Sequence, residues 1–236
     1  GKKADTAALQ DELTGALIGL ARTADNSPNI CESTYNTIIE GLFTTLTNVS
    51  FDNRVIEDTI QKVRDEKHRL APDCASCASP CGKNDEYNMN QLWSADEDIR
   101  SLKSLILFGI RGMAAYAYHA DALGYSDDEV TLFFYKALNA VGMDYGMEEL
   151  LPIVLQVGEV TLKCMELLDK ANTETFGNPV PAEVTMKVEK GPFIVVTGHD
   201  LYDLKQLLEQ TKDKGINIDQ HVFMFNQEIQ HIVNWY

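Results

Sequence analysis

Apolar residues recur every three or four positions along most of this chain, which is the spacing of amphipathic helices. The first such stretch ends at Asn26-Ser27-Pro28, a helix-breaking sequence. Four leucines share one face of this stretch: Leu9, Leu13, Leu17 and Leu20. The same spacing predicts further helices over about 31–47, 52–70, 96–123, 126–142 and 146–172. The chain is therefore predicted to be helical as far as residue 172.

The pattern changes after residue 191, where β-branched and aromatic residues replace the helical spacing. The run "PFIVVT" at 192–197 predicts a buried strand, and Gly198 and His199 follow it directly. The next stretch, "DLYDLKQLLEQTKDK", predicts a helix with Asp200 as its N-cap and Gly215 after its end. "INI" then begins a second strand. The order strand, helix, strand is that of a parallel sheet.

Several side chains on the predicted helices are interpreted as structural. Ser126-Asp127-Asp128-Glu129 is a helix-start signal, with Glu129 at the capping-box position. Glu159 and Lys163 lie one helical turn apart and are predicted to form a surface ion pair. His119 is interpreted as a partly exposed structural residue. Five aromatic residues are predicted to be core: Tyr116, Tyr118, Phe133, Phe134 and Tyr135.

The helical part contains an internal similarity that indicates duplication. "LTNVSFD" at 46–52 and "LNAVGMD" at 138–144 share Leu-x-x-Val-x-(Phe/Met)-Asp at an offset of 92 residues. Gly1-Lys2 is likewise echoed by Gly82-Lys83. Two copies of a three-helix unit account for these similarities. The alternative is a chance likeness between amphipathic helices.

The predicted fold class is mainly α, with two duplicated three-helix bundles followed by a short β-α-β start of a parallel, Rossmann-like α/β domain. The predicted divisions are a helical domain at 1–172 (units at about 1–70 and 86–172, joined by a cysteine-rich loop at 71–85), a linker at 173–191, and a partial α/β segment with a divergent tail at 192–236.

The charge balance narrows the classes of partner. The formal net charge is −16, from 36 acidic and 20 basic residues. The negative electrostatic potential of such a chain repels nucleic acid and attracts a basic protein such as a redox donor. No run of about 18 apolar residues occurs, so no membrane partner is expected. No charged-then-apolar leader is present either.

The cysteines indicate metal or redox chemistry rather than a disulfide framework. There are 5 cysteines, an odd number, which suits a reducing cytoplasm. Cys74, Cys77 and Cys81 form a C-x2-C-x3-C loop whose thiolates can converge on one iron or zinc. Three free thiols, or two that cycle as a disulfide, are the alternatives.

His199 lies where the predicted strand meets the predicted helix. Ligands gather at the carboxyl ends of strands in open α/β sheets, and Asp200 and Asp203 can hold the imidazole as partners. The alternative is a histidine that packs at the turn and hydrogen-bonds the backbone. The sequence contains no glycine-rich phosphate loop, nucleophile elbow or H-E-x-x-H motif.

Three stretches resemble the hybrid-cluster protein family, also called hydroxylamine reductases or prismane proteins. They are "DCASCASPCGKNDEYNMNQLW", "LILFGIRGMAAYAYHADALGY" and, most specifically, "GPFIVVTGHDLYDLKQLLEQTKDKGINI". The resemblance spans residues 1–218. It implies a helical domain of two three-helix bundles followed by α/β domains.

The resemblance also implies cofactors and an activity. Family members hold a cubane iron–sulfur cluster and a hybrid iron–sulfur–oxygen cluster, and they are associated with the reduction of hydroxylamine to ammonia and of nitric oxide. The histidine of the family's "GHD" motif, a hybrid-cluster ligand, matches His199. The resemblance does not imply a family cluster at the cysteine loop.

The chain departs from the family pattern at several ligand positions. The family's four cubane cysteines come before a Gly-Lys, and this chain begins at Gly1-Lys2. Near the other end, His221 falls at a family histidine, whereas Phe223 stands where the family has a glutamate ligand. The remaining cysteine ligands belong to later domains. We therefore expect a chain truncated at both ends.

The sequence thus leaves two functions open. The first is an iron–sulfur oxidoreductase of the hydroxylamine reductase kind, incomplete as this chain alone, acting on a small nitrogen compound. The second is a non-catalytic, truncated helical module that binds a partner, with or without a structural metal at the cysteine loop. A third possibility is that the chain assembles with another chain that supplies the missing ligands.

Overall fold

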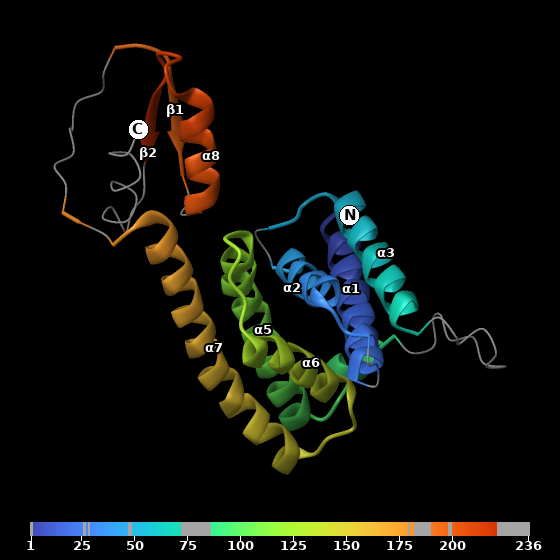
Figure 1. Ribbon diagram of the computed structural model, residues 1–236. Helices are drawn as coiled ribbons and strands as arrows, with labels where there is room; N and C mark the ends of the chain where they lie inside the picture. The colour runs from blue at the N-terminus through green and yellow to red at the C-terminus, as the bar shows by residue number, and fades with distance from the viewer. Residues whose placement is uncertain are drawn as a thin grey trace. The chain divides into compact units, whose positions relative to one another are not determined.

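The computed structural model describes residues 2–25, 27, 29–46, 49–71, 86–178, 180–181, 190–197 and 200–220. Within these ranges the chain forms eight α-helices and one two-stranded parallel sheet (Figure 1). The contacts divide the chain into two compact units. The first unit is Gly1–Tyr118 with Ser126–Leu167, and the second is His119–Tyr125 with Leu168–Tyr236.

The first unit is helical, as the hydrophobic spacing predicts. Its elements are α1 (Lys2–Asp25), α2 (Glu32–Thr44), α3 (Asn53–Leu70), α4 (Met89–Trp93), most of α5 (Glu97–Ala122), α6 (Asp128–Gly142) and most of α7 (Met147–Phe176). The six long helices confirm the predicted ones to within a few residues at each end. The short α4 was not predicted, because five residues are too few to show a helical period.

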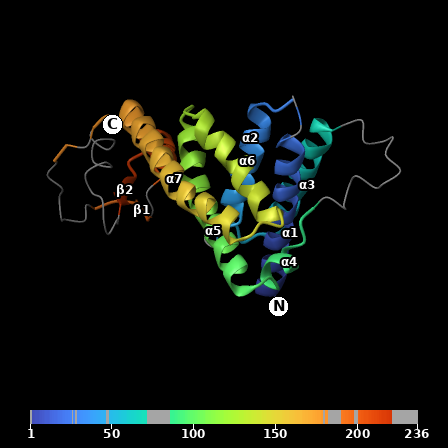
Figure 2. The ribbon, with the colours of Figure 1, turned by 90° about the horizontal axis from the view of Figure 1, so that it is seen from below.

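Helix α1 lies at the centre of the first unit, in contact with α2, α3, α4 and α6. Figures 1 and 2 both show α3 running alongside it. Leu13, Leu17 and Leu20 are fully buried, and Leu9 packs against the same core. The leucine stripe that predicts the helix is therefore also the side that binds its neighbours.

The aromatic residues predicted to be core are buried on α6 and less so on α5. Phe133, Phe134 and Tyr135 are at most 5% exposed. Tyr116 packs against the core from a partly buried position, whereas Tyr118 is 37% exposed and stacks on Phe43 with ring centroids 4.5 Å apart. Tyr118 thus corrects the prediction, since it lies at the edge of the core.

Helix α6 begins one residue later than the capping-box pattern indicates. The N-cap is Asp127, whose carboxylate accepts the backbone N–H groups of Glu129 at 2.9 Å and Val130 at 3.1 Å. A capping box would have placed Ser126 there. A carboxylate that accepts two backbone donors satisfies the helix start better than one serine hydroxyl.

Lys163 corrects a second local prediction, because it does not pair with Glu159. Its ammonium group lies 3.4 Å from the Asp127 carboxylate and also pairs with Glu129. The ion pairs therefore join α7 to the start of α6. A sequence pattern cannot show this link, because both carboxylates belong to another helix.

The second unit contains a β-α-β segment, as predicted. Strand β1 (Phe193–Val196) runs parallel to β2 (Asn217–Gln220), with Phe193 opposite Asn217, and α8 (Leu201–Thr211) connects them. Gly215, in the left-handed region at φ 64°, follows the helix. One apolar cluster joins this segment to the end of α7: Leu201, Leu204, Leu208, Phe176 and Ile218.

One prediction for this region is wrong. Strand β1 is not buried, because Phe193, Ile194 and Val195 are 55%, 37% and 53% exposed. Parallel sheets are normally covered on both faces, whereas α8 is the one helix that connects β1 and β2. Helix α7 ends at Phe176, a few residues after its predicted end, and Gly177 at φ 87° follows it.

None of the helices in the described ranges is both long enough and apolar enough to cross a membrane.

Candidate functional site

The candidate site from the sequence is the turn between β1 and α8. His199 and Gly198 lie outside the described residues, but the flanking residues Thr197 and Asp200 are described. Asp200 is the N-cap of α8, and its carboxylate accepts the backbone N–H of Asp203 at 3.0 Å. Residues 198–199 thus come, along the chain, between the carboxyl end of a parallel strand and a capped helix start, the place where α/β sheets bind ligands.

The Asp200 carboxylate is also paired with a histidine that is distant in sequence. His119 Nδ1, near the end of α5, lies 2.9 Å from Asp200 Oδ2. Hydrogen bonding from His119, followed by that from the backbone N–H of Asp203, lowers the pKa of the Asp200 carboxyl. Asp200 is therefore anionic at neutral pH and anchors the residue next to His199.

A second hydrogen bond fixes the segment that bears His119. The Tyr125 hydroxyl donates to Glu174 Oε2 at 2.7 Å, and this bond raises the pKa of Tyr125. His119, Tyr125 and Glu174 all belong to the second unit. Sequence analysis treated His119 as merely structural, because no local pattern connects it to Asp200.

The three cysteines of the predicted metal loop, Cys74, Cys77 and Cys81, lie outside the described residues. Metal binding there stays a prediction. Among residues that are described, no three His, Cys, Asp or Glu side chains gather closely enough to hold a metal ion. None of the predicted ligands, His199 included, lies among the described residues.

The two described cysteines have opposite environments. Cys164 is buried in α7, with its Sγ 3.6 Å from the Met113 carbonyl oxygen, and burial raises its pKa to about 12. It is a neutral thiol at physiological pH. Cys31 is exposed at the start of α2.

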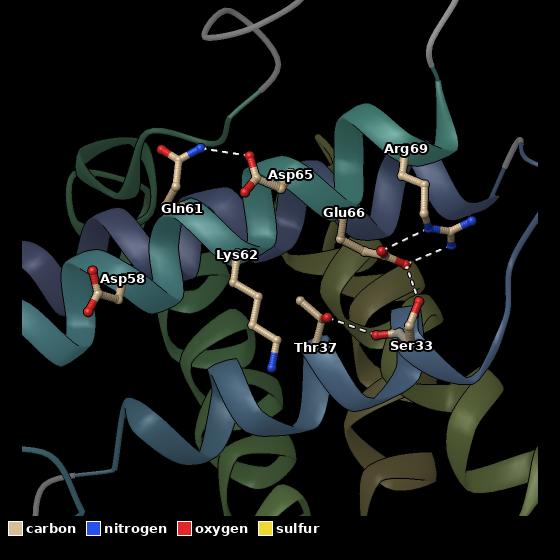
Figure 3. A pocket seen from close by; sticks show the side chains of 8 residues that line it. All are labelled: Ser33, Thr37, Asp58, Gln61, Lys62, Asp65, Glu66 and Arg69. Carbon is tan, nitrogen blue, oxygen red and sulfur yellow. Dashed lines mark hydrogen bonds and ion pairs between the residues drawn. The ribbon is translucent and has the colours of Figure 1, made fainter.

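The first unit contains a polar groove of about 480 Å³ between α2 and α3 (Figure 3). Eight residues line it: Ser33, Thr37, Asp58, Gln61, Lys62, Asp65, Glu66 and Arg69. Lys62 pairs with Glu40, and Gln61 donates to Asp65 at 2.8 Å. The sequence analysis did not single out this groove, because its residues come from two helices and form no motif.

One end of the groove is organised around Glu66 (Figure 3). Arg69 donates two hydrogen bonds to its carboxylate, at 2.7 and 2.9 Å. Thr34 Oγ1 and Ser33 Oγ lie 2.5 and 3.1 Å from Glu66 Oε1. These donors, Arg69 above all, lower the pKa of Glu66 to about 2.

Replacing Glu66 by glutamine is expected to remove a pH-dependent part of the stability. The pKa of Glu66 is lower in the folded chain, so its stabilisation is present above the unfolded pKa of about 4.3 and is lost as pH falls toward 2. We expect Glu66→Gln to destabilise by about 1–2 kcal/mol at pH 7, since water screens part of the pair.

Urea unfolding at pH 7 and pH 3 tests this, with Asp65→Asn as the control from the same groove. The difference between Glu66→Gln and the parent chain should shrink at pH 3. An equal difference at both pH values would contradict the assignment.

Comparison with known proteins gives the relatives of this chain. The chain is similar to proteins named hydroxylamine reductase from Thermodesulfovibrio yellowstonii (41% identity over 243 residues) and Maridesulfovibrio salexigens (41% over 235 residues). A third, from Methanococcus vannielii, is 39% identical over 240 residues. Each match covers 94% of this chain but only 44–45% of the relative.

The chain thus spans less than half the length of the curated relatives that it matches. Residues 1–229, which include the whole described structure, match the Prismane/CO dehydrogenase family. The helices and the β-α-β segment are accordingly those of a member of the Prismane/CO dehydrogenase family, to which this chain belongs.

Proposed function

We propose that this chain forms part of an iron–sulfur oxidoreductase of the hydroxylamine reductase kind, in which His199 is an iron ligand. The observation that carries the proposal is the family match over residues 1–229, together with relatives of that name at up to 41% identity. The substrate would be hydroxylamine or nitric oxide. The net charge of −16 favours a basic redox protein as the electron donor.

The surroundings of the turn support a ligand role for His199. Strands β1 and β2 are parallel, and His199 follows the carboxyl end of β1 in the sequence. The adjacent Asp200 is held by His119 at 2.9 Å and by the N–H of Asp203. A turn that is anchored on one side orients an imidazole at less entropic cost than a free loop does.

The described residues do not by themselves fit an iron–sulfur cluster. Such clusters are held chiefly by several cysteine thiolates. Cys164 is a buried thiol hydrogen-bonded to the Met113 carbonyl oxygen. Cys31 lies beside the α2–α3 groove, next to Arg69. We therefore assign no reaction step to this chain alone, and propose that most cluster ligands come from protein outside it.

The finer division of the fold is part of the same proposal. We infer that α1–α2–α3 and α5–α6–α7 are two copies of one three-helix unit within a helical domain at 1–172. The helix order supports this, because a long helix, a shorter helix and another long helix occur in both sets. The segment at 192–236 would begin a Rossmann-like α/β domain.

One observation favours the rival function, a non-catalytic helical module that binds a partner. Helix α7 has exposed leucines on the side opposite its buried residues: Leu155 and Leu162 are 65% and 60% exposed, whereas Val160 and Cys164 are buried. A helix that is apolar on two opposite sides is typical of a larger assembly.

Iron analysis separates the two functions. The chain is purified without oxygen, and iron and acid-labile sulfide per chain are measured with the visible spectrum and native mass. We expect iron in an assembly heavier than one chain, lost in His199→Ala and kept in His68→Ala, an exposed histidine of α3. Colourless, iron-free protein in an assembly heavier than one chain would overturn the oxidoreductase proposal and leave the partner-binding module.

A further inference from the structure

We propose that Cys31 is a redox modification site, which hydrogen peroxide converts to a sulfenate held by Arg69 and Ser33. The site lies beside the α2–α3 groove and does not depend on the proposed iron–sulfur function.

The Cys31 sulfur lies among hydrogen-bond donors. Its Sγ is 3.2 Å from Ser33 Oγ, 3.2 Å from Arg69 Nη2 and 4.0 Å from Thr34 Oγ1. Cys31 is also the N-cap residue of α2, where the helix dipole favours negative charge. The exposed sulfur thus lies beside a cation, a hydroxyl group and the start of a helix. These surroundings favour the thiolate, which is the nucleophilic form of cysteine.

The buried hydroxyl of Tyr135 is a second observation near this sulfur. Its side chain is 5% exposed, and its hydroxyl has no hydrogen-bond partner among the described residues. Burial, and then the charges of Cys31 and Glu66, raise its pKa to about 12. The hydroxyl is therefore an unused donor within electrostatic reach of the sulfur, and leaving a buried donor unpaired is costly.

The electrostatics agree with this geometry. Hydrogen bonding from Ser33 is the largest cause that lowers the pKa of Cys31. Hydrogen bonding to Glu66, followed by the negative charges of Glu66 and Cys31, raises the pKa of Arg69 in turn. Cys164, by contrast, has a pKa raised to about 12 by burial. Two cysteines of one chain are thus expected to differ widely in thiolate fraction at neutral pH.

The reaction balances without any cofactor. The thiolate sulfur attacks one oxygen of hydrogen peroxide, so that an S–O bond forms and the O–O bond breaks. Sulfur loses two electrons, and the other oxygen leaves as hydroxide and takes up the proton to become water. The sulfenate oxygen remains anionic beside Arg69, and an external thiol can later displace it to give a disulfide.

The first test uses the whole folded chain. Equimolar hydrogen peroxide is added at pH 7 with dimedone, which traps sulfenate, and peptide mass spectrometry locates the label. We expect label on Cys31 and none on Cys164, with the Cys74, Cys77 and Cys81 peptide resolved separately. A Cys31 that is labelled no faster than in the urea-unfolded chain would overturn the proposal.

Arg69→Met is expected to slow the labelling of Cys31 at pH 7 by roughly three- to tenfold, since each unit of pKa rise lowers the thiolate fraction about tenfold. Lys62→Met is the matched control, because Lys62 is a cation of the same groove that pairs with Glu40 instead. An unchanged rate in a folded Arg69→Met chain would contradict the role of Arg69.

Two measurements remain decisive even if Arg69→Met does not fold. In the parent chain, iodoacetamide alkylation of Cys31 should reach half its maximal rate below pH 8.5, the ordinary thiol pKa being about 8.5. Tyr135→Phe should leave that alkylation unchanged but shorten the lifetime of the sulfenate. A half-maximal pH at or above the ordinary value, or an unchanged lifetime, would count against the proposal.

Discussion

Replacing Phe134 by alanine is expected to lower the free energy of unfolding by about 3–5 kcal/mol. Phe134 on α6 is fully buried, and its ring packs against Tyr35 on α2 with centroids 6.4 Å apart. Removing the ring leaves a cavity where α6 meets α2, and well-packed helices close such a cavity only partly.

Leu132→Ala is the matched control, because Leu132 lies on the same helix and is 64% exposed. Its effect should stay within about 0.5 kcal/mol of zero. Urea unfolding followed by far-UV circular dichroism measures both variants. If the two variants lost similar stability, the assignment of Phe134 to the core would be wrong.

Gly15→Ala is expected to destabilise the chain by about 1–3 kcal/mol, although alanine is the better helix former. The Gly15 carbonyl accepts the backbone N–H of Tyr87 at 3.1 Å, so the chain crosses α1 at this point. A Cβ on Gly15 would lie 2.2 Å from the Tyr87 carbonyl oxygen. Backbone cannot move aside as a flexible side chain can.

Gly112→Ala supplies the opposite expectation on α5. A Cβ at Gly112 meets no atom within 4 Å, so alanine should stabilise by up to about 1 kcal/mol through its helix propensity. Thermal unfolding of the two variants should therefore shift in opposite directions. A stabilised Gly15→Ala chain would show that the segment at Tyr87 does not pack on α1 as described.

Much of the fold follows from local patterns. The leucine stripe of α1 and the periodic segments of the other long helices predict elements that the structure contains within a few residues. The change to β-branched residues predicts β1, and Asp200 marks the start of α8 as predicted. The helix ends at Thr211 with Lys212 as its C-cap, so Gly215 does not close it as predicted. Each of these signals lies within about one element, which is why a sequence can reveal it.

The candidate site follows only in part. The motif around His199 predicts its place between a strand and a helix, and the described flanking elements confirm that strand and helix exist. The ligand roles of His199, Cys74, Cys77 and Cys81 stay predictions, since these residues lie outside the described part of the chain. The sequence did not predict that His119 would hold Asp200.

The sequence by itself determined the helical class, the late parallel strand pair and the family. The hydrophobic periodicity, the helix caps and the "GHD" stretch that indicate them each involve residues close together in the chain. Only the tertiary structure decided which side chains meet: Lys163 with α6, His119 with Asp200, and Arg69 with Cys31. These contacts join residues from separate elements. Packing brings such residues together, and no local spacing encodes their distance.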